Sequence, residues 1–93
     1  MIVGVLRLEL FIGASDSLKE KRRILTSLTE RIRHRFPVSV AEVDGQDTWQ
    51  RATLGVAVVS NDSRHAQQVL STIVAFVQRD AAVELMDYSM ELL

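Results

Sequence analysis

Residues 2–20, IVGVLRLELFIGASDSLKE, carry the signals that decide the fold. Residues 2–12 are rich in aliphatic side chains, and Leu6, Leu8, Leu10 and Ile12 alternate with Arg7, Glu9 and Phe11, the period of a strand that buries one of its faces. Gly13 ends this run. Ser17 and Glu20 then have the spacing of a capping box, which predicts a helix that begins after Ser17. A strand and a capped helix therefore open the fold.

The remaining chain repeats this kind of unit. The helix is predicted to run to about His34, because Phe36-Pro37 disfavours helix beyond it. Further strands are expected at residues 38–43, 50–60 and 83–92, and a second helix after the cap candidates at 61–63. The order β-α-β-β-α-β predicts an α+β, ferredoxin-like fold with a four-stranded antiparallel sheet and both helices on one face.

Length and composition indicate a single ordinary domain over residues 1–93. The chain is 47% hydrophobic and 25% charged, which is typical of a soluble globular protein. It has no cysteine, and Arg7 and Glu9 interrupt its apolar N-terminal stretch. We find neither a signal peptide nor an apolar run long enough to span a membrane. The expected location is the cytoplasm.

Positive charge is concentrated in the first predicted helix. Seven of the eleven Lys and Arg residues lie between residues 17 and 35, so this segment has a net charge of about +5 and the rest about −6. Four of them fall in the first two turns, where the helix dipole opposes positive charge. Because stability does not favour this placement, we predict phosphate binding by Lys19, Lys21, Arg22, Arg23 and Arg33.

Parts of this basic set also have a structural interpretation. Arg31, Arg33 and Arg35 lie in the last turns, where cations complement the helix dipole by about 0.3–1 kcal/mol each. Lys21 falls within the apolar stripe of the helix. Its side chain either snorkels from the edge of the core or bends towards the end of the sheet. The residues alone leave both interpretations open.

Two serine-containing loops suggest a second, weaker anion site. We expect the first and third strands to be parallel neighbours at the sheet centre, so that the loops after them lie side by side. Two helix N-termini would then converge there with free amide groups. The residues predicted at this site are Ser15, Ser17, Asn61 and Ser63. Asp16 and Asp62 in the same loops favour plain helix capping instead.

The sheet face opposite the helices should carry apolar side chains without a covering layer. With the even positions of the first strand under the helices, Val3, Val5 and Phe11 lie on this open face. We expect it to be covered, most simply by a second copy of the chain, which makes these residues a predicted interface. The third strand has no aromatic residue, so base stacking on the sheet is disfavoured.

Trp49 is the only tryptophan in the chain. It falls where the predicted hairpin rejoins the third strand. Such a residue either packs across its own hairpin or stacks on a base or a protein partner.

Catalytic and metal-binding motifs are missing from the sequence. His34 and His65 lie on different predicted helices, without an acid or nucleophile in a recognisable arrangement. No cysteine and no histidine pair at helical spacing is present to bind a metal. The four glycines are scattered and form no phosphate-binding or dinucleotide-binding motif. We therefore expect a non-enzymatic protein without cofactor or metal.

Several segments together resemble a known family. They are residues 17–22 (SLKEKR), 35–42 (RFPVSVAE), 49–50 (WQ) and 54–62 (LGVAVVSND). In combination they resemble the YlxP-like family of small bacterial proteins, a domain of unknown function, over nearly the whole chain. The resemblance implies a ferredoxin-like fold and no assigned catalytic residue. Members are often encoded beside translation initiation and ribosome-maturation factors, which implies a role near the ribosome or RNA.

Two hypotheses for function follow. The first is an RNA- or ribosome-associated protein that contacts phosphates through its first helix, without base specificity. The alternative is a homodimeric protein-interaction or small-ligand-sensing module that uses the open sheet face. Their partners would be RNA or a ribosomal subunit in the first case, and a second copy of the chain in the other.

Overall fold

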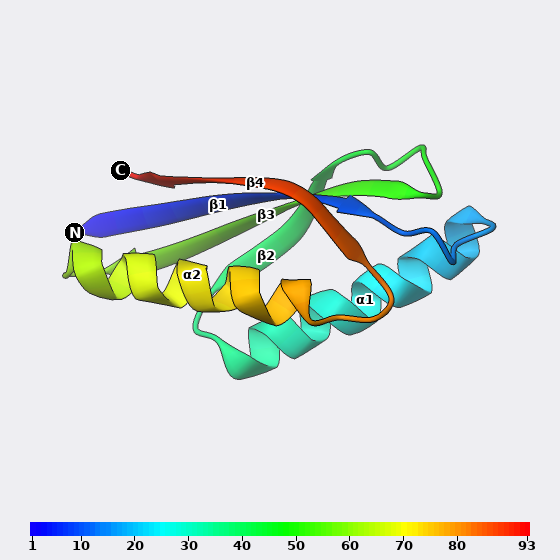
Figure 1. The fold of residues 1–93 in the computed structure, drawn as a ribbon. Coiled ribbons are helices and arrows are strands. Elements are labelled where there is room, and N and C mark those ends of the chain that lie inside the picture. The colour runs from blue at the N-terminus through cyan, green and yellow to red at the C-terminus, as the bar shows by residue number, and fades with distance from the viewer.

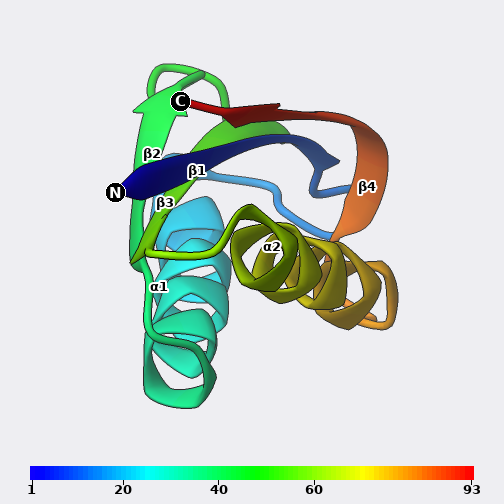
Figure 2. The same cartoon turned by 90° about the vertical axis from the view of Figure 1, so that its left-hand side faces the viewer.

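Six elements follow one another in the predicted order. The computed structural model describes residues 1–93 and contains β1 (Ile2–Phe11), α1 (Leu18–Arg35), β2 (Ser39–Asp44), β3 (Arg51–Ser60), α2 (Ser63–Gln78) and β4 (Glu84–Leu92) (Figure 1). The strands form one sheet in the order β2-β3-β1-β4, and all neighbouring pairs are antiparallel. Both helices lie on the same side of this sheet (Figure 2). The predicted ferredoxin-like fold is confirmed.

Side-chain caps set where the two helices begin. Ser17 Oγ accepts a hydrogen bond from the Glu20 amide at 3.1 Å, which confirms the predicted N-cap of α1. The Asp62 carboxylate accepts from an amide in the first turn of α2 in the same way. At its other end α1 stops before Phe36, which is extended because Pro37 follows it. Neither helix is long and apolar enough to cross a membrane.

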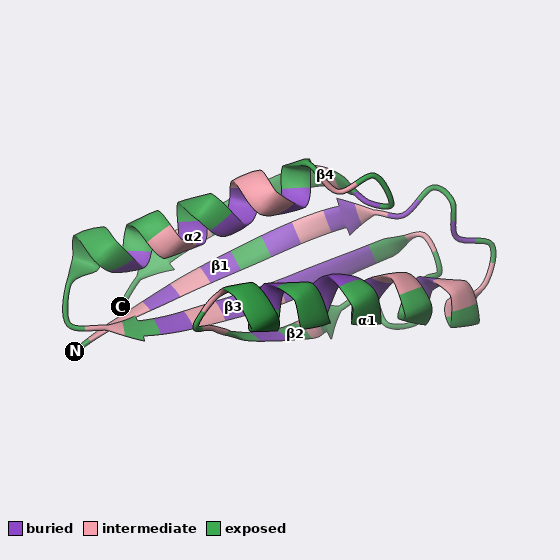
Figure 3. Ribbon diagram, turned by 90° about the horizontal axis from the view of Figure 1, so that it is seen from below, coloured by how far each residue is buried: buried purple, intermediate pink, exposed green.

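The core lies between the sheet and the helix layer. Buried positions alternate along β1 and along β3 from Leu54 to Val58, and they form one stripe on each helix (Figure 3). The side chains that are completely inaccessible to solvent include Leu8, Leu54, Leu28, Ile32, Leu70 and Ile73. Burial of each such side chain stabilises the fold by about 1.5–3 kcal/mol. The predicted burial of the even positions of β1 is confirmed.

The direction of the two central strands differs from our expectation. β1 and β3 are neighbours, but they run antiparallel, with Ile2 opposite Ser60 and Phe11 opposite Arg51. The α1 crossover makes β2 parallel to β1, and the hairpin between β2 and β3 then reverses the chain. The prediction of parallel central strands is therefore wrong. The loops after β1 and β3 lie at opposite ends of the sheet, about 30 Å apart along the strands.

Replacing Leu28 with Ala should lower the free energy of unfolding by about 2–5 kcal/mol, because it leaves a cavity between α1 and the sheet. The neighbouring Ser27 is exposed, so Ser27→Ala is the matched control and should change stability by less than about 0.5 kcal/mol. Urea denaturation of both variants measures the difference. Equal stabilities would contradict the packing of α1 onto the core.

Candidate functional site

The basic residues of the chain are gathered on one helix. α1 contains seven of the eleven Lys and Arg residues and only two of the twelve Asp and Glu residues. Its net charge is therefore +5, against −6 for the rest of the chain. α1 lies beside α2 on one face of the sheet (Figure 2). The positive charge of α1 is therefore on that side of the molecule. The helix is the strongest candidate for a surface that meets an anion.

Three cations in the first two turns of α1 are weakly neutralised. Lys19 and Arg22 are exposed and form no ion pair or side-chain hydrogen bond. Arg23 has one carboxylate nearby, the Glu20 Oε2 atom at 3.7 Å, and its own side chain is 73% exposed. The dipole of the helix and the repulsion between these cations oppose their placement. We name Lys19, Arg22 and Arg23 the N-terminal cluster.

Lys21 does not belong to this exposed surface. Its residue is only 1% exposed, and its ammonium group donates hydrogen bonds to the carbonyl oxygens of Gly45 and Thr48 in the β2–β3 hairpin. The Glu42 Oε2 atom lies 2.9 Å from Lys21 Nζ, although the two are not aligned as a hydrogen bond. The prediction that Lys21 contacts phosphate is wrong. The interpretation in which it bends towards the end of the sheet is confirmed.

The shape of the hairpin explains why Lys21 finds acceptors there. Gly45 has a φ of 81°, a left-handed conformation that side chains other than glycine rarely adopt. This turn directs the Gly45 carbonyl oxygen to the Lys21 ammonium group, and the same oxygen also accepts a hydrogen bond from the Thr48 hydroxyl. A buried ammonium group is tolerated only with such partners. Lys21 therefore acts as a clamp between α1 and the hairpin.

The arginines of the C-terminal half of α1 have partners within the molecule. Arg31 pairs with Asp80 at 2.7 Å, and one amino group of Arg33 donates to the Val40 carbonyl oxygen at 2.7 Å. Arg35 lies over the ring of Phe76, 5.4 Å from its centroid. These contacts support the structural interpretation of this end of the helix. Arg33 is still exposed, so its predicted phosphate contact stays a prediction.

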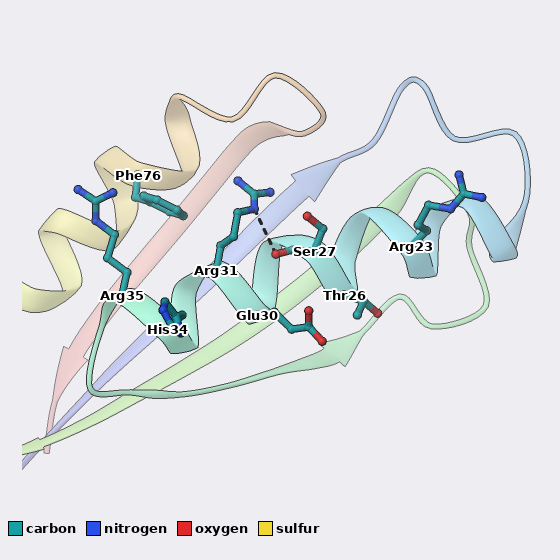
Figure 4. A pocket seen from close by; sticks show the side chains of 8 residues that line it. All are labelled: Arg23, Thr26, Ser27, Glu30, Arg31, His34, Arg35 and Phe76. Atoms are coloured by element: carbon teal, nitrogen blue, oxygen red, sulfur yellow. Dashed lines mark hydrogen bonds between the residues drawn. The ribbon is translucent and has the colours of Figure 1, made fainter.

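An open groove of about 930 Å³ runs along α1 on the side of α2 (Figure 4). It is lined by Arg23, Thr26, Ser27, Glu30, Arg31, His34, Arg35 and Phe76. Glu30 is its only acid, and two hydroxyl groups stand between the arginines. Figure 4 shows Arg23 at one end of this row and Arg35, beside Phe76, at the other. The groove was not predicted from the sequence, although the α1 residues that line it recur at the helical spacings of three and four.

The predicted anion site between two loops does not exist. Ser15 and Ser17 follow β1, whereas Asn61 and Ser63 follow β3 at the opposite end of the sheet. Ser15 is buried, and its hydroxyl donates to the Ser17 carbonyl oxygen at 2.9 Å. Ser17 itself caps α1. The prediction failed because it depended on parallel central strands.

The open face of the sheet is partly apolar and partly acidic. Val3, Val5 and Phe11 are half-buried there, as predicted, but Arg7 and Glu9 separate Phe11 from the two valines. Cross-strand register aligns Asp44, Thr53, Glu9 and Asp87 in one row. This row disfavours contact with a polyanion on the open face. No three His, Cys, Asp or Glu side chains are close enough together to hold a metal ion.

Two comparisons place the chain among known proteins. Residues 3–90 match the model of a family described as a protein of unknown function, DUF503. The chain is also 35% identical over 83 residues to the uncharacterized protein YlxP of Bacillus subtilis (strain 168), which covers 89% of this chain and 90% of that protein. The resemblance noted from the sequence motifs is confirmed.

The clamp formed by Lys21 gives a prediction about stability. Lys21→Met keeps the stem but removes the ammonium group, so the free energy of unfolding should fall by about 2–4 kcal/mol. Lys19→Met is the control at an exposed position and should change it by less than about 0.5 kcal/mol. Urea denaturation provides the measurement. Equal stabilities of the Lys21→Met and Lys19→Met variants would contradict the clamp.

Proposed function

Since the chain belongs to the DUF503 family of proteins of unknown function, we propose from its geometry that it is a non-enzymatic RNA-binding protein acting through α1. The observation that supports this most is the N-terminal cluster. Lys19, Arg22 and Arg23 place positive charge where the helix dipole opposes it. Only Arg23 has a carboxylate nearby, so most of this charge is not neutralised within the molecule. Phosphate groups of a bound nucleic acid would supply the missing counter-charge.

The proposed contacts are to the RNA backbone. Lysine and arginine side chains on one exposed helix face bind phosphates and release counterions, without reading base edges. The groove beside the cluster adds the hydroxyl groups of Thr26 and Ser27, which can donate to phosphate oxygens. The acidic row of the sheet would repel RNA from the opposite side. The expected complex therefore has RNA on the helix layer only.

Ribosomal subunits are the first RNA to examine. The motif resemblance implies a genomic association with translation, and ribosomal RNA is the most abundant polyanion in that setting. Direct contact with rRNA would make this protein an accessory factor of the ribosome or of its assembly. If the protein binds free RNA but not ribosomal subunits, the RNA-binding proposal still holds, and the partner is an RNA outside the ribosome.

Reversal of two charges in the cluster tests this proposal. Arg22→Glu/Arg23→Glu should reduce RNA affinity by roughly 10–100-fold, because two phosphate contacts become repulsive. Thermal unfolding should be nearly unchanged, since both side chains are exposed. Co-sedimentation with ribosomal subunits and binding to labelled RNA measure the effect at fixed salt.

A matched control separates a local site from net charge. Arg64→Glu/Arg79→Glu changes the net charge of the protein by the same amount, but at exposed positions on α2 and its C-terminal end. This control should bind RNA within about threefold of the unchanged protein. Equal losses in both double variants would show a nonspecific charge effect, and no binding of the unchanged protein even at low salt would overturn the proposal.

The open sheet face supports a second candidate, a homodimer. Val59 is 65% exposed and Val43 is 50% exposed on this face, and the half-buried Val3 and Val5 lie on it as well. The Arg7 guanidinium lies beside Glu9 and 3.8 Å from Asp44, so a two-fold axis could pair these charges between copies. This use of the sheet leaves α1 free. A dimer would therefore present two basic helices.

Sedimentation velocity tests the dimer. The unchanged chain should sediment as a dimer at tens of micromolar, and Val59→Asp should shift it to monomer, because a carboxylate would be buried in the interface. Tyr88→Asp, at an exposed position that the register places on the helix side of β4, is the control and should leave the dimer intact. A monomeric unchanged chain at high micromolar concentration would contradict this candidate.

A further inference from the structure

Trp49 has no aromatic partner and does not belong to the core. Its residue is 52% exposed, and the only close aromatic pair in the chain is Phe36 with Phe76. Trp49 borders an open hollow of about 350 Å³, and the rest of the lining comes from adjacent loop residues. The indole is therefore available for contact with a ligand.

Hydrogen bonds attach the residues on either side of Trp49 to α1 and to the segment that precedes it. The Thr48 carbonyl oxygen accepts a hydrogen bond from the buried Lys21 ammonium group. Gln50 is held twice: its carbonyl oxygen accepts from the Ile12 amide at 2.7 Å, and its side chain donates to the Ser15 carbonyl oxygen at 3.4 Å. These contacts join the hairpin to the loop that leads into α1.

This connection places the indole at the same end of the molecule as the N-terminal cluster. The hairpin loop between β2 and β3 and the first turns of α1 lie together beyond the end of the sheet in two perpendicular views (Figures 1 and 3). Arg51 adds a further exposed cation, while Asp16 and Asp47 are exposed acids at this end. Proteins that bind single-stranded nucleic acids combine exposed aromatic residues with exposed cations, and both are present at this end of the molecule.

We propose that Trp49 is a base-stacking residue, so that this end of the molecule binds single-stranded rather than double-stranded RNA. An unpaired base would lie against the indole, while neighbouring phosphates contact Lys19, Arg22 and Arg23. Stacking is tolerant of sequence because every base has a flat face. This inference rests on the proposed RNA-binding function and adds to it the class of RNA and the residue that selects it.

Intrinsic fluorescence of the full chain tests the inference directly, since Trp49 is the only tryptophan. A short oligouridylate should quench the Trp49 emission on binding, because the base stacks on the indole. Inorganic polyphosphate should bind the cations without quenching. Duplex RNA of the same length should bind more weakly and leave the emission unchanged. Quenching that is equal for all three ligands, or absent with the oligouridylate, would overturn the inference.

Substitutions at Trp49 provide a second measurement, with anisotropy of labelled oligouridylate as the readout. Trp49→Ala should weaken binding roughly tenfold, whereas Trp49→Phe keeps an aromatic face and should bind within about threefold. Both variants should be folded by circular dichroism, because Trp49 is exposed. Unchanged binding of Trp49→Ala would overturn the stacking role.

The two proposals fail in distinguishable ways. If Arg22→Glu/Arg23→Glu abolishes RNA binding while Trp49→Ala does not affect it, α1 binds RNA and stacking is overturned. If the unchanged chain binds no RNA at low salt, both proposals are overturned. If oligouridylate binding is absent but Trp49 emission shifts on addition of a protein partner, the exposed indole is a protein-contact residue instead.

Discussion

The buried ammonium group of Lys21 fixes the β2–β3 hairpin relative to α1. It is the only lysine side chain inside the core, and its hydrogen bonds to the carbonyls of Gly45 and Thr48 attach the β2–β3 hairpin to α1. The Glu42 carboxylate supplies its counter-charge. Because an unpartnered buried ammonium group would be strongly unfavourable, helix and hairpin must become ordered together. Together with the hydrogen bonds of Gln50 to Ile12 and Ser15, this contact holds Trp49 at the same end of the molecule as the N-terminal cluster.

The other cations of α1 divide into two groups by position along the helix. Arg31, Arg33 and Arg35 are engaged by Asp80, Val40 and Phe76 at the end where the helix dipole favours them. The N-terminal cluster lies where the dipole is unfavourable and is left largely unpaired. The acidic row of Asp44, Glu9 and Asp87 lies on the opposite face of the sheet, so the surface proposed for RNA and the surface proposed for a second copy are separate. The two proposed surfaces do not compete.

Sequence alone predicted the fold well, because each element has a strong local signal. The alternation in β1, the Ser17 cap and the Phe36-Pro37 stop depend on neighbours close in the chain, and all three were confirmed. Strand direction and the environment of Lys21 depend on contacts distant in sequence. The loop site at Ser15 and Asn61 failed because it required a strand direction that the hairpin reverses. Periodicity could place Lys21 in the apolar stripe, but it could not reveal the hairpin carbonyls that accept its hydrogen bonds.

The salt dependence of RNA affinity tests the central claim most directly, because it counts the phosphates that the protein neutralises. Three contacts from Lys19, Arg22 and Arg23 to a single strand predict that the logarithm of the association constant falls against the logarithm of salt concentration with a slope of about −2. Reversal of Arg22 and Arg23 should bring this slope towards zero. A slope that is near zero in the unchanged protein, or equally steep after the reversal, would contradict a functional role for the N-terminal cluster.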